Sequence, residues 1–152
     1  MDIYDYIVIL LIAIFFTISY SLGFTPLLLP IIFVLSSTLA FFINIKDKRA
    51  AEKGEWRTPE STLHLISLLC GWPGAFLAQK VFRHKTRKVS FQITFWVTVL
   101  ANISLIAWFH TPVGSSTLHA YVRQLSNIVV SSFGQNEVSE VLLFCLQYKA
   151  TT

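Results

Sequence analysis

The sequence LLCGWPGAFLAQ, residues 68–79, lies between two basic stretches and decides whether the chain crosses a membrane at this point or turns back. It contains Gly71, Pro73 and Gly74 where a continuous membrane helix would have apolar residues. Pro73 lacks an N–H and clashes with the preceding helical turn, and glycine is common just after the C-terminus of a helix. The stretch therefore predicts two short helices within residues 61–82, with the turn between them at Gly71–Gly74 and Gly71 as the C-terminal cap of the first helix.

The composition indicates a membrane protein. Hydrophobic residues make up 54% of the 152 residues and charged residues only 13%, whereas about a quarter of the residues in a soluble domain are charged. Three apolar runs, at 6–22, 27–45 and 91–109, reach the length that a transmembrane helix needs. We therefore predict an all-α integral membrane helical bundle with three spans, a re-entrant or kinked helix pair and a C-terminal amphipathic tail.

The C-terminal region, residues 110–152, differs from the predicted transmembrane domain, residues 1–109. Apolar side chains recur there at helical spacing, but neither of its two short helical patterns is long and apolar enough for a span. We expect an amphipathic helical tail that either lies on the membrane face or packs on the bundle.

The positions of lysine and arginine indicate the topology. Ten of the 12 flank the broken segment, five in 46–57 and five in 80–88. A simple span at 61–82 would put five cations on each side, contrary to the cytoplasmic bias of positive charge. A re-entrant pair would keep the N-terminus and both basic loops on the cytoplasmic side of a bacterial inner membrane. The alternative is a kinked third span, because about 21 residues could just cross.

Small residues around the break favour close helix packing. Glycine and alanine let neighbouring helix backbones approach within a membrane, and irregular backbone at that depth is tolerated only where protein surrounds it. We predict that the packing and turn residues are Gly71, Trp72, Pro73, Gly74, Ala75 and Ala78.

Four motifs between Asp47 and Phe91 carry a resemblance to a known family. They are Asp47-Lys48-Arg49, Arg57-Thr58-Pro59-Glu60, Gly71-Trp72-Pro73-Gly74 and His84-Lys85-Thr86-Arg87-Lys88. In this order they resemble the bacterial membrane family known as domain of unknown function twelve-ninety-four. The resemblance implies several transmembrane segments and no established activity.

The basic residues beside the helices predict an anion-binding surface. Each lysine or arginine near a membrane surface attracts anionic lipid by about 1 kcal/mol, and an arginine can hold a phosphate with two hydrogen bonds. The alternative is that these charges only orient the helices during insertion. The candidate residues are Arg57, Lys80, Arg83, His84, Lys85, Thr86, Arg87 and Lys88.

The acidic residues and histidines offer fewer candidates. Glu60 and His64 form a candidate intramembrane polar site, although a shallow histidine that is hydrogen-bonded to a neighbour is the favoured explanation of His64. Asp47, Glu52 and Glu60 are expected to pair with the cations as exposed, individually weak ion pairs.

The remaining patterns exclude most catalytic and metal sites. Cys70 and Cys145 have no metal-ligand or redox spacing, and we find neither a catalytic motif nor a nucleic-acid-binding module. We expect no metal and no cofactor.

Together these features predict a small, multi-pass, non-enzymatic inner-membrane protein. Its cationic cytoplasmic face would bind anionic lipid or an acidic partner, and a protein partner or a second copy of the chain would be compatible with this role. No direct binding of nucleic acid is expected. The alternative function is a membrane enzyme or transporter that acts on a phosphate-bearing lipid or a small anion.

Overall fold

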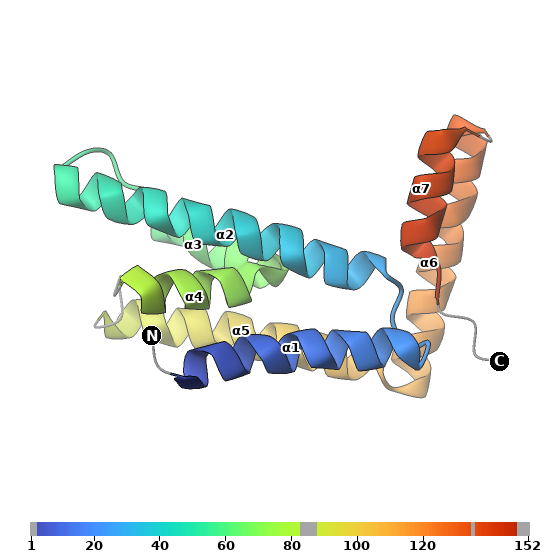
Figure 1. Cartoon of the computed structure of the whole chain (residues 1–152), viewed down its shortest axis with the longest axis horizontal. Helices are drawn as coiled ribbons and strands as arrows, with labels where there is room; N and C mark the ends of the chain where they lie inside the picture. Colours follow the sequence, from blue (N-terminus) through green and yellow to red (C-terminus); the bar gives the residue numbers. More distant parts are fainter. Residues whose placement is uncertain (1–2, 83–87, 135, 149–152) are drawn as a thin grey trace. The chain divides into compact units, whose positions relative to one another are not determined.

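The computed structural model describes residues 3–82, 88–134 and 136–148, and all regular structure in these ranges is helical (Figure 1). The predicted all-α class is confirmed. The elements are α1 (Ile3–Ser21), α2 (Leu28–Lys53), α3 (Glu60–Ile66), a wide π-helical turn η1 (Ser67–Gly71), α4 (Trp72–Phe82), α5 (Val89–Phe109), α6 (Pro112–Phe133) and α7 (Glu137–Leu146).

Three helical stretches of the described chain are long and apolar enough to cross a membrane by length and composition. They are Leu28–Lys53, Glu60–Phe82 and Val89–Phe109. The first and last contain the predicted spans 27–45 and 91–109 almost entirely. The predicted span 6–22 coincides with a shorter apolar helix, Tyr6–Ser21.

The chain forms two compact units. The first comprises Met1–Leu11 and Ile32–Ser104, and the second comprises Ile12–Ile31 and Leu105–Thr152. The first unit contains most of α2, the broken pair α3–α4 and most of α5.

Helix α2 ends where the sequence provides a residue suited to a reversal. Gly54 has a φ of 69°, a left-handed conformation that glycine adopts without a steric penalty. The N–H of Glu55 then donates to the carbonyl of Ala50 at 2.9 Å, which satisfies one of the last carbonyls of the helix. The chain thereby leaves α2 and leads into α3.

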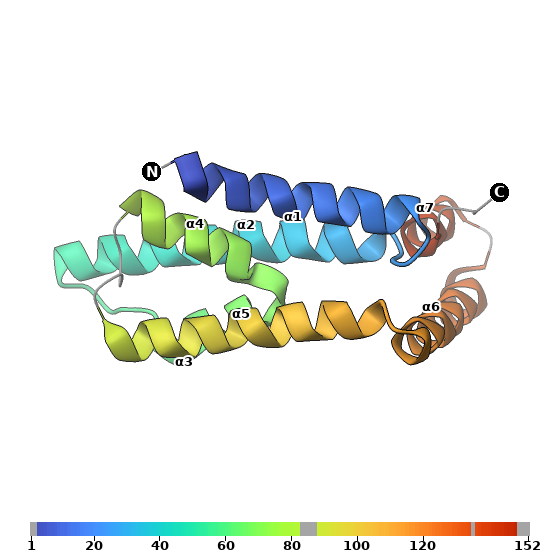
Figure 2. The ribbon, with the colours of Figure 1, turned by 90° about the horizontal axis from the view of Figure 1, so that it is seen from below.

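Helices α3 and α4 form a hairpin, because the chain turns back between them (Figures 1 and 2). The helical conformation is interrupted at Leu69 and Cys70, and Cys70 has a φ of 67°. At the other end of the hairpin, the Nζ of Lys48 on α2 donates to the carbonyl of Phe82 at 2.9 Å. The N–H of Thr58, just before α3, donates to a carboxylate oxygen of Asp47 on α2 at 3.0 Å. The start of α3 and the end of α4 therefore both lie beside the C-terminal half of α2.

The break lies earlier than the sequence predicts. Gly71 is not the left-handed cap of the incoming helix, since Cys70 takes that conformation instead. Gly71 is required at this point because a Cβ atom would lie 2.5 Å from the carbonyl oxygen of Ile66 in the preceding turn and 2.9 Å from that of Ser36 on α2. Pro73 lies in the first turn of α4, where its missing N–H costs no helical hydrogen bond.

The hairpin packs closely on α2 through its small residues. A Cβ atom on Gly74 would overlap the backbone carbonyl of Ser37, so the two backbones approach as closely as glycine permits. Ala75 and Ala78, one turn apart on the same helix, are only 2% and 1% exposed. The predicted small residues thus lie at a helix contact in the first unit.

On its other side the hairpin is held by α5. The Nδ2 of Asn102, which is 4% exposed, donates to the carbonyl of Leu68 at 3.0 Å and lies 3.4 Å from that of Ser67. The break in the helix deprives carbonyls at this point of helical partners, and unpaired carbonyls are costly in an apolar interior. Asn102 therefore supplies hydrogen bonds that the broken helix lacks.

The second unit contains the C-terminal pair α6 and α7, which pack against each other. Thr111 caps α6 by accepting a hydrogen bond from the N–H of Gly114 at 3.1 Å, and Gly134 ends this helix with a φ of 63°. Within the same unit, the Oγ of Ser19 lies 2.9 Å from the Nε2 of His110. The predicted amphipathic tail is thus two helices.

Candidate functional site at the open end of the hairpin

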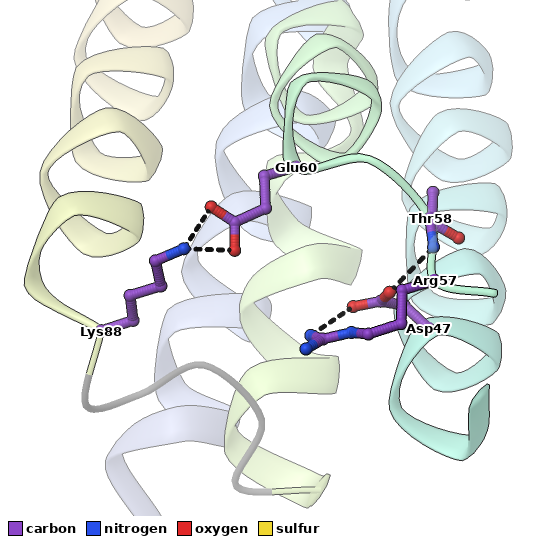
Figure 3. A network of polar contacts seen from close by, with 5 residues as sticks. All are labelled: Asp47, Arg57, Thr58, Glu60 and Lys88. Atoms are coloured by element: carbon purple, nitrogen blue, oxygen red, sulfur yellow. Dashed lines mark hydrogen bonds and ion pairs between the residues drawn. The ribbon is translucent and has the colours of Figure 1, made fainter. Parts of the chain in front are cut away.

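A buried carboxylate organises the junction between α2 and α3 (Figure 3). Asp47 is fully buried, and its Oδ1 accepts a hydrogen bond from the N–H of Thr58 at 3.0 Å. Its Oδ2 lies 3.5 Å from the guanidinium of Arg57, which is half exposed. Because a buried charge is tolerated only when it is paired and hydrogen-bonded, these contacts fix the loop that follows Gly54 against α2.

Helix α3 starts just after this junction. Thr58 followed by Pro59 and Glu60 is a sequence that favours Thr58 as the N-cap, but the N-cap in the structure is Pro59. The carbonyl of Pro59 accepts the first hydrogen bonds of the helix, from Thr62 at 3.1 Å and Leu63 at 3.4 Å. Helix α3 therefore begins one residue later than the sequence predicts.

A second ion pair joins the start of α3 to the start of α5. The Nζ of Lys88 lies 2.8 Å from both carboxylate oxygens of Glu60 (Figure 3). The two side chains are 54% and 37% exposed, so water and salt screen the pair and its contribution is about 1 kcal/mol or less. The expected pairing of an acidic residue with the second basic run is present here.

Lys48 closes the hairpin from the side of α2. Besides donating to the carbonyl of Phe82, its Nζ lies 5.6 Å from the centre of the Phe82 ring and 3.4 Å from Glu52. The end of α4 is thereby fixed to α2, although no sequence pattern singles out Lys48 for this role.

The cations at this end fall into two groups. Lys48, Arg57 and Lys88 are in ion pairs with carboxylates. Lys46, Arg49 and Lys53 are exposed and form no ion pair with any residue that the structure describes. The cations best placed to meet a ligand are therefore the second group, none of which is among the anion-binding residues that the sequence predicts.

These three cations line a groove along one face of α2, which we call the α2 groove. Trp56 lies beside them with 93% of its surface exposed, an unusual position for an indole. The sequence signal was the four-three-four spacing of Phe42, Lys46, Arg49 and Lys53, which places them on one helix face. The lining residues of the α2 groove are Phe42, Ile45, Lys46, Arg49, Ala50, Lys53, Glu55 and Trp56.

The other predicted anion-binding residues have different surroundings. Arg83, His84, Lys85, Thr86 and Arg87 lie outside the described residues. The Nζ of Lys80 lies over the ring of Phe76, 5.4 Å from its centre.

The predicted polar pair Glu60 and His64 lies in a second, open groove between α3 and α5. The rest of its lining is mostly hydroxyl and apolar side chains: Ser61, Leu65, Leu68, Ser90, Phe91, Thr94 and Thr98. The His64 ring packs 4.4 Å from the ring of Phe91. Glu60 faces Lys88, so the structure brings an ion pair and a packed imidazole to this groove.

Candidate metal ligands and thiols are sparse in the described part of the chain. In residues 3–82, 88–134 and 136–148 the structure contains no cluster of three or more histidine, cysteine or acidic side chains that could hold a metal ion. Cys70 and Cys145 are both free thiols.

Comparison with known proteins covers the region just described. A family described as "Protein of unknown function (DUF1294)" matches residues 37–91, which run from α2 through the hairpin to the start of α5. The "Uncharacterized protein YsdA" of Bacillus subtilis (strain 168) is 34% identical over 79 residues, covering 52% of this chain and 89% of the relative. No solved structure matches the chain.

Proposed function

Because the chain belongs to the DUF1294 family, whose description assigns no activity, we propose a function from the geometry: a non-enzymatic membrane protein whose cationic face binds anionic lipid head groups. The ligand is the negatively charged surface of the membrane that contains the protein. The proposal gives the two basic stretches one shared role.

The observation that supports this proposal is the return of the hairpin. Since the start of α3 and the end of α4 both lie beside the C-terminal half of α2, described cations from both basic stretches meet at one end of the first unit. Anionic lipids attract clustered basic residues next to a membrane helix, and the attraction adds up over the cluster. A single straight helix at 60–82 would instead have separated the two stretches.

We infer the membrane side from the distribution of the same cations. Short loops rich in lysine and arginine remain in the cytoplasm, so we place the open end of the hairpin on the cytoplasmic side of a bacterial inner membrane, with the N-terminus on that side too. Lys53→Cys and Lys85→Cys, each in a Cys70→Ala/Cys145→Ala background, should both be protected from an impermeant thiol reagent in intact cells. Labelling of only one of the two positions would contradict the re-entrant topology.

Lipid selectivity tests the proposed function directly. Protein purified in detergent and offered equal amounts of phosphatidylglycerol and phosphatidylcholine should retain more phosphatidylglycerol, as counted by native mass spectrometry. The preference should fall with added salt, because the Debye length shrinks from about 10 Å at 0.1 M to about 3 Å at 1 M. Equal retention of the two lipids at low salt would overturn the proposal.

A further inference from the structure

We propose that the α2 groove is the specific site for the phosphate of an anionic glycerophospholipid, with Arg49 at its centre and Lys46, Lys53 and Trp56 around it. This inference rests on the proposed function and gives it a location. It differs from the location that the sequence favours, the dense run 82–88.

The spacing of the three cations suits one phosphate. Lys46 lies three residues before Arg49 and Lys53 four residues after it, and residues at these separations are neighbours on a helix face, about 5–6 Å apart. The arginine side chain presents two parallel donors that match two phosphate oxygens, and each lysine adds a mobile positive charge. All three side chains are exposed and available.

The C-terminal end of a helix attracts cations even without a ligand, and this attraction is the alternative explanation of the three cations. The negative end of the helix dipole stabilises lysine or arginine only within the last turn. Of the three cations only Lys53 is in the last turn of α2, and Lys46 is about two turns from the end. The dipole therefore explains Lys53 but not Lys46.

Trp56 supplies an independent indication of the membrane surface. The reversal at Gly54 brings this residue back to the cationic face of α2, where its side chain is 93% exposed and lines the same groove. Tryptophan is enriched at the level of lipid head groups, where its ring contacts apolar chains and its N–H contacts water or phosphate. An indole in this position is explained if the groove lies at that level.

The groove also has a direction. At one end it is lined by Phe42, which is 62% exposed, and Leu39 and Leu35 continue the exposed apolar face of α2 at 53% and 65%. A phosphate held at Arg49 would therefore direct its acyl chains along the apolar part of the same helix. This continuity favours a lipid of the surrounding leaflet over a soluble phosphate compound.

The charge balance of the groove favours a lipid with a net negative charge. Three cations and the one carboxylate that lines the groove, Glu55, leave a net charge of +2. That carboxylate can also accept a hydrogen bond from a head-group hydroxyl, as in phosphatidylglycerol. A zwitterionic phosphatidylcholine offers neither the net charge nor a hydroxyl.

The test compares two triple variants of the full-length protein that lose the same charge. Lys46→Gln/Arg49→Gln/Lys53→Gln should lower the preference for phosphatidylglycerol over phosphatidylcholine by about tenfold or more. Arg83→Gln/Lys85→Gln/Arg87→Gln should lower it less. An equal loss in both variants, or a greater loss in the second, would overturn the assignment to the α2 groove while leaving the proposed function intact. Absence of any preference in the wild type would instead reject the proposed function itself.

Two single substitutions separate a built site from a diffuse field. Arg49→Lys keeps the charge but removes the paired donors, so it should weaken the preference for phosphatidylglycerol by about threefold. If only long-range electrostatic attraction mattered, the preference would not change. Trp56→Ala should weaken it by a similar factor with no change in net charge. Both side chains are exposed, so the thermal unfolding of both variants should match that of the wild type. An unchanged preference in both variants would overturn the proposal.

Discussion

The two ends of the α3–α4 hairpin are held by different physical interactions. At the turn, Gly74 approaches the backbone of Ser37 and Asn102 supplies hydrogen bonds to the broken helix. At the open end, Asp47 and Glu60 each form an ion pair. The turn therefore tolerates no added volume, whereas the open end is held by charge pairs and leaves Lys46, Arg49 and Lys53 without an ion pair to any described residue. The fold is specified at one end, and the ligand would be bound at the other.

The largest expected effect is at the turn. Gly74→Ala places a Cβ atom on the carbonyl of Ser37, so α4 must move away from α2 and most of the folded protein should be lost. The yield of monodisperse protein on size-exclusion chromatography and its cooperative melting would measure this loss. Gly54→Ala is the matched control, because its Cβ atom meets open space and only the left-handed backbone costs about 1–2 kcal/mol. Equal behaviour of the two variants would remove the packing argument.

At the open end, the buried acid should make the next largest difference. Arg57→Gln removes the half-exposed guanidinium beside the buried carboxylate of Asp47, which keeps its hydrogen bond from Thr58, and should destabilise the protein by about 2 kcal/mol. Asp47→Asn/Arg57→Gln should recover part of this loss, because no buried charge remains. Denaturant titration of both variants in detergent would measure the difference. A double variant less stable than Arg57→Gln would show that the charge of Asp47 is not the source of the cost.

Asn102 tests the hydrogen bonds of the turn separately from its packing. Asn102→Ala leaves the carbonyl of Leu68 without its side-chain donor and should cost about 1–2 kcal/mol, the upper range for a hydrogen bond between membrane helices. Thr94→Ala on the same helix is the control, since its hydroxyl is exposed and donates to the carbonyl of Ser90 in its own helix. A cost no greater than that of the control would mean that the broken helix needs no external donor.

The smallest effect is expected for the exposed pair. Lys88→Gln should destabilise the protein by less than about 1 kcal/mol, because both partners are accessible to water. At 1 M salt the difference from the wild type should vanish. A larger effect that persists in salt would place this pair in the same class as the buried one and weaken the contrast between the two ends.

The sequence predicts the fold well because its signals are local and strong. Apolar runs of membrane-spanning length define α2 and α5, and the glycines and proline at 71–74 predict a break close to the observed one at Leu69 and Cys70. The exact turn was predicted too late because Gly71 has two suitable roles, as a cap and as a contact. Only the approach of α2 selects the second role.

The candidate site was less predictable because it depends on tertiary pairing. The sequence predicts that Asp47 is an exposed acidic residue, but the loop after Gly54 packs over it and buries it. Charge density along the chain favours the run 82–88 over Lys46, Arg49 and Lys53, which are separated by other residues. The spacing of the cations along the sequence does not show which of them pair with carboxylates. The α2 groove is selected because its three cations form no ion pair with the described residues.

The dependence of the broken helix on Asn102 also bears on the order in which the helices assemble. The ribosome makes Leu68 34 residues before Asn102, so the carbonyl enters the membrane system before its donor exists. Because unpaired backbone is not tolerated against lipid, we expect the hairpin to dock only after α5 emerges. A nascent chain arrested before residue 102 should therefore leave this segment accessible to proteases.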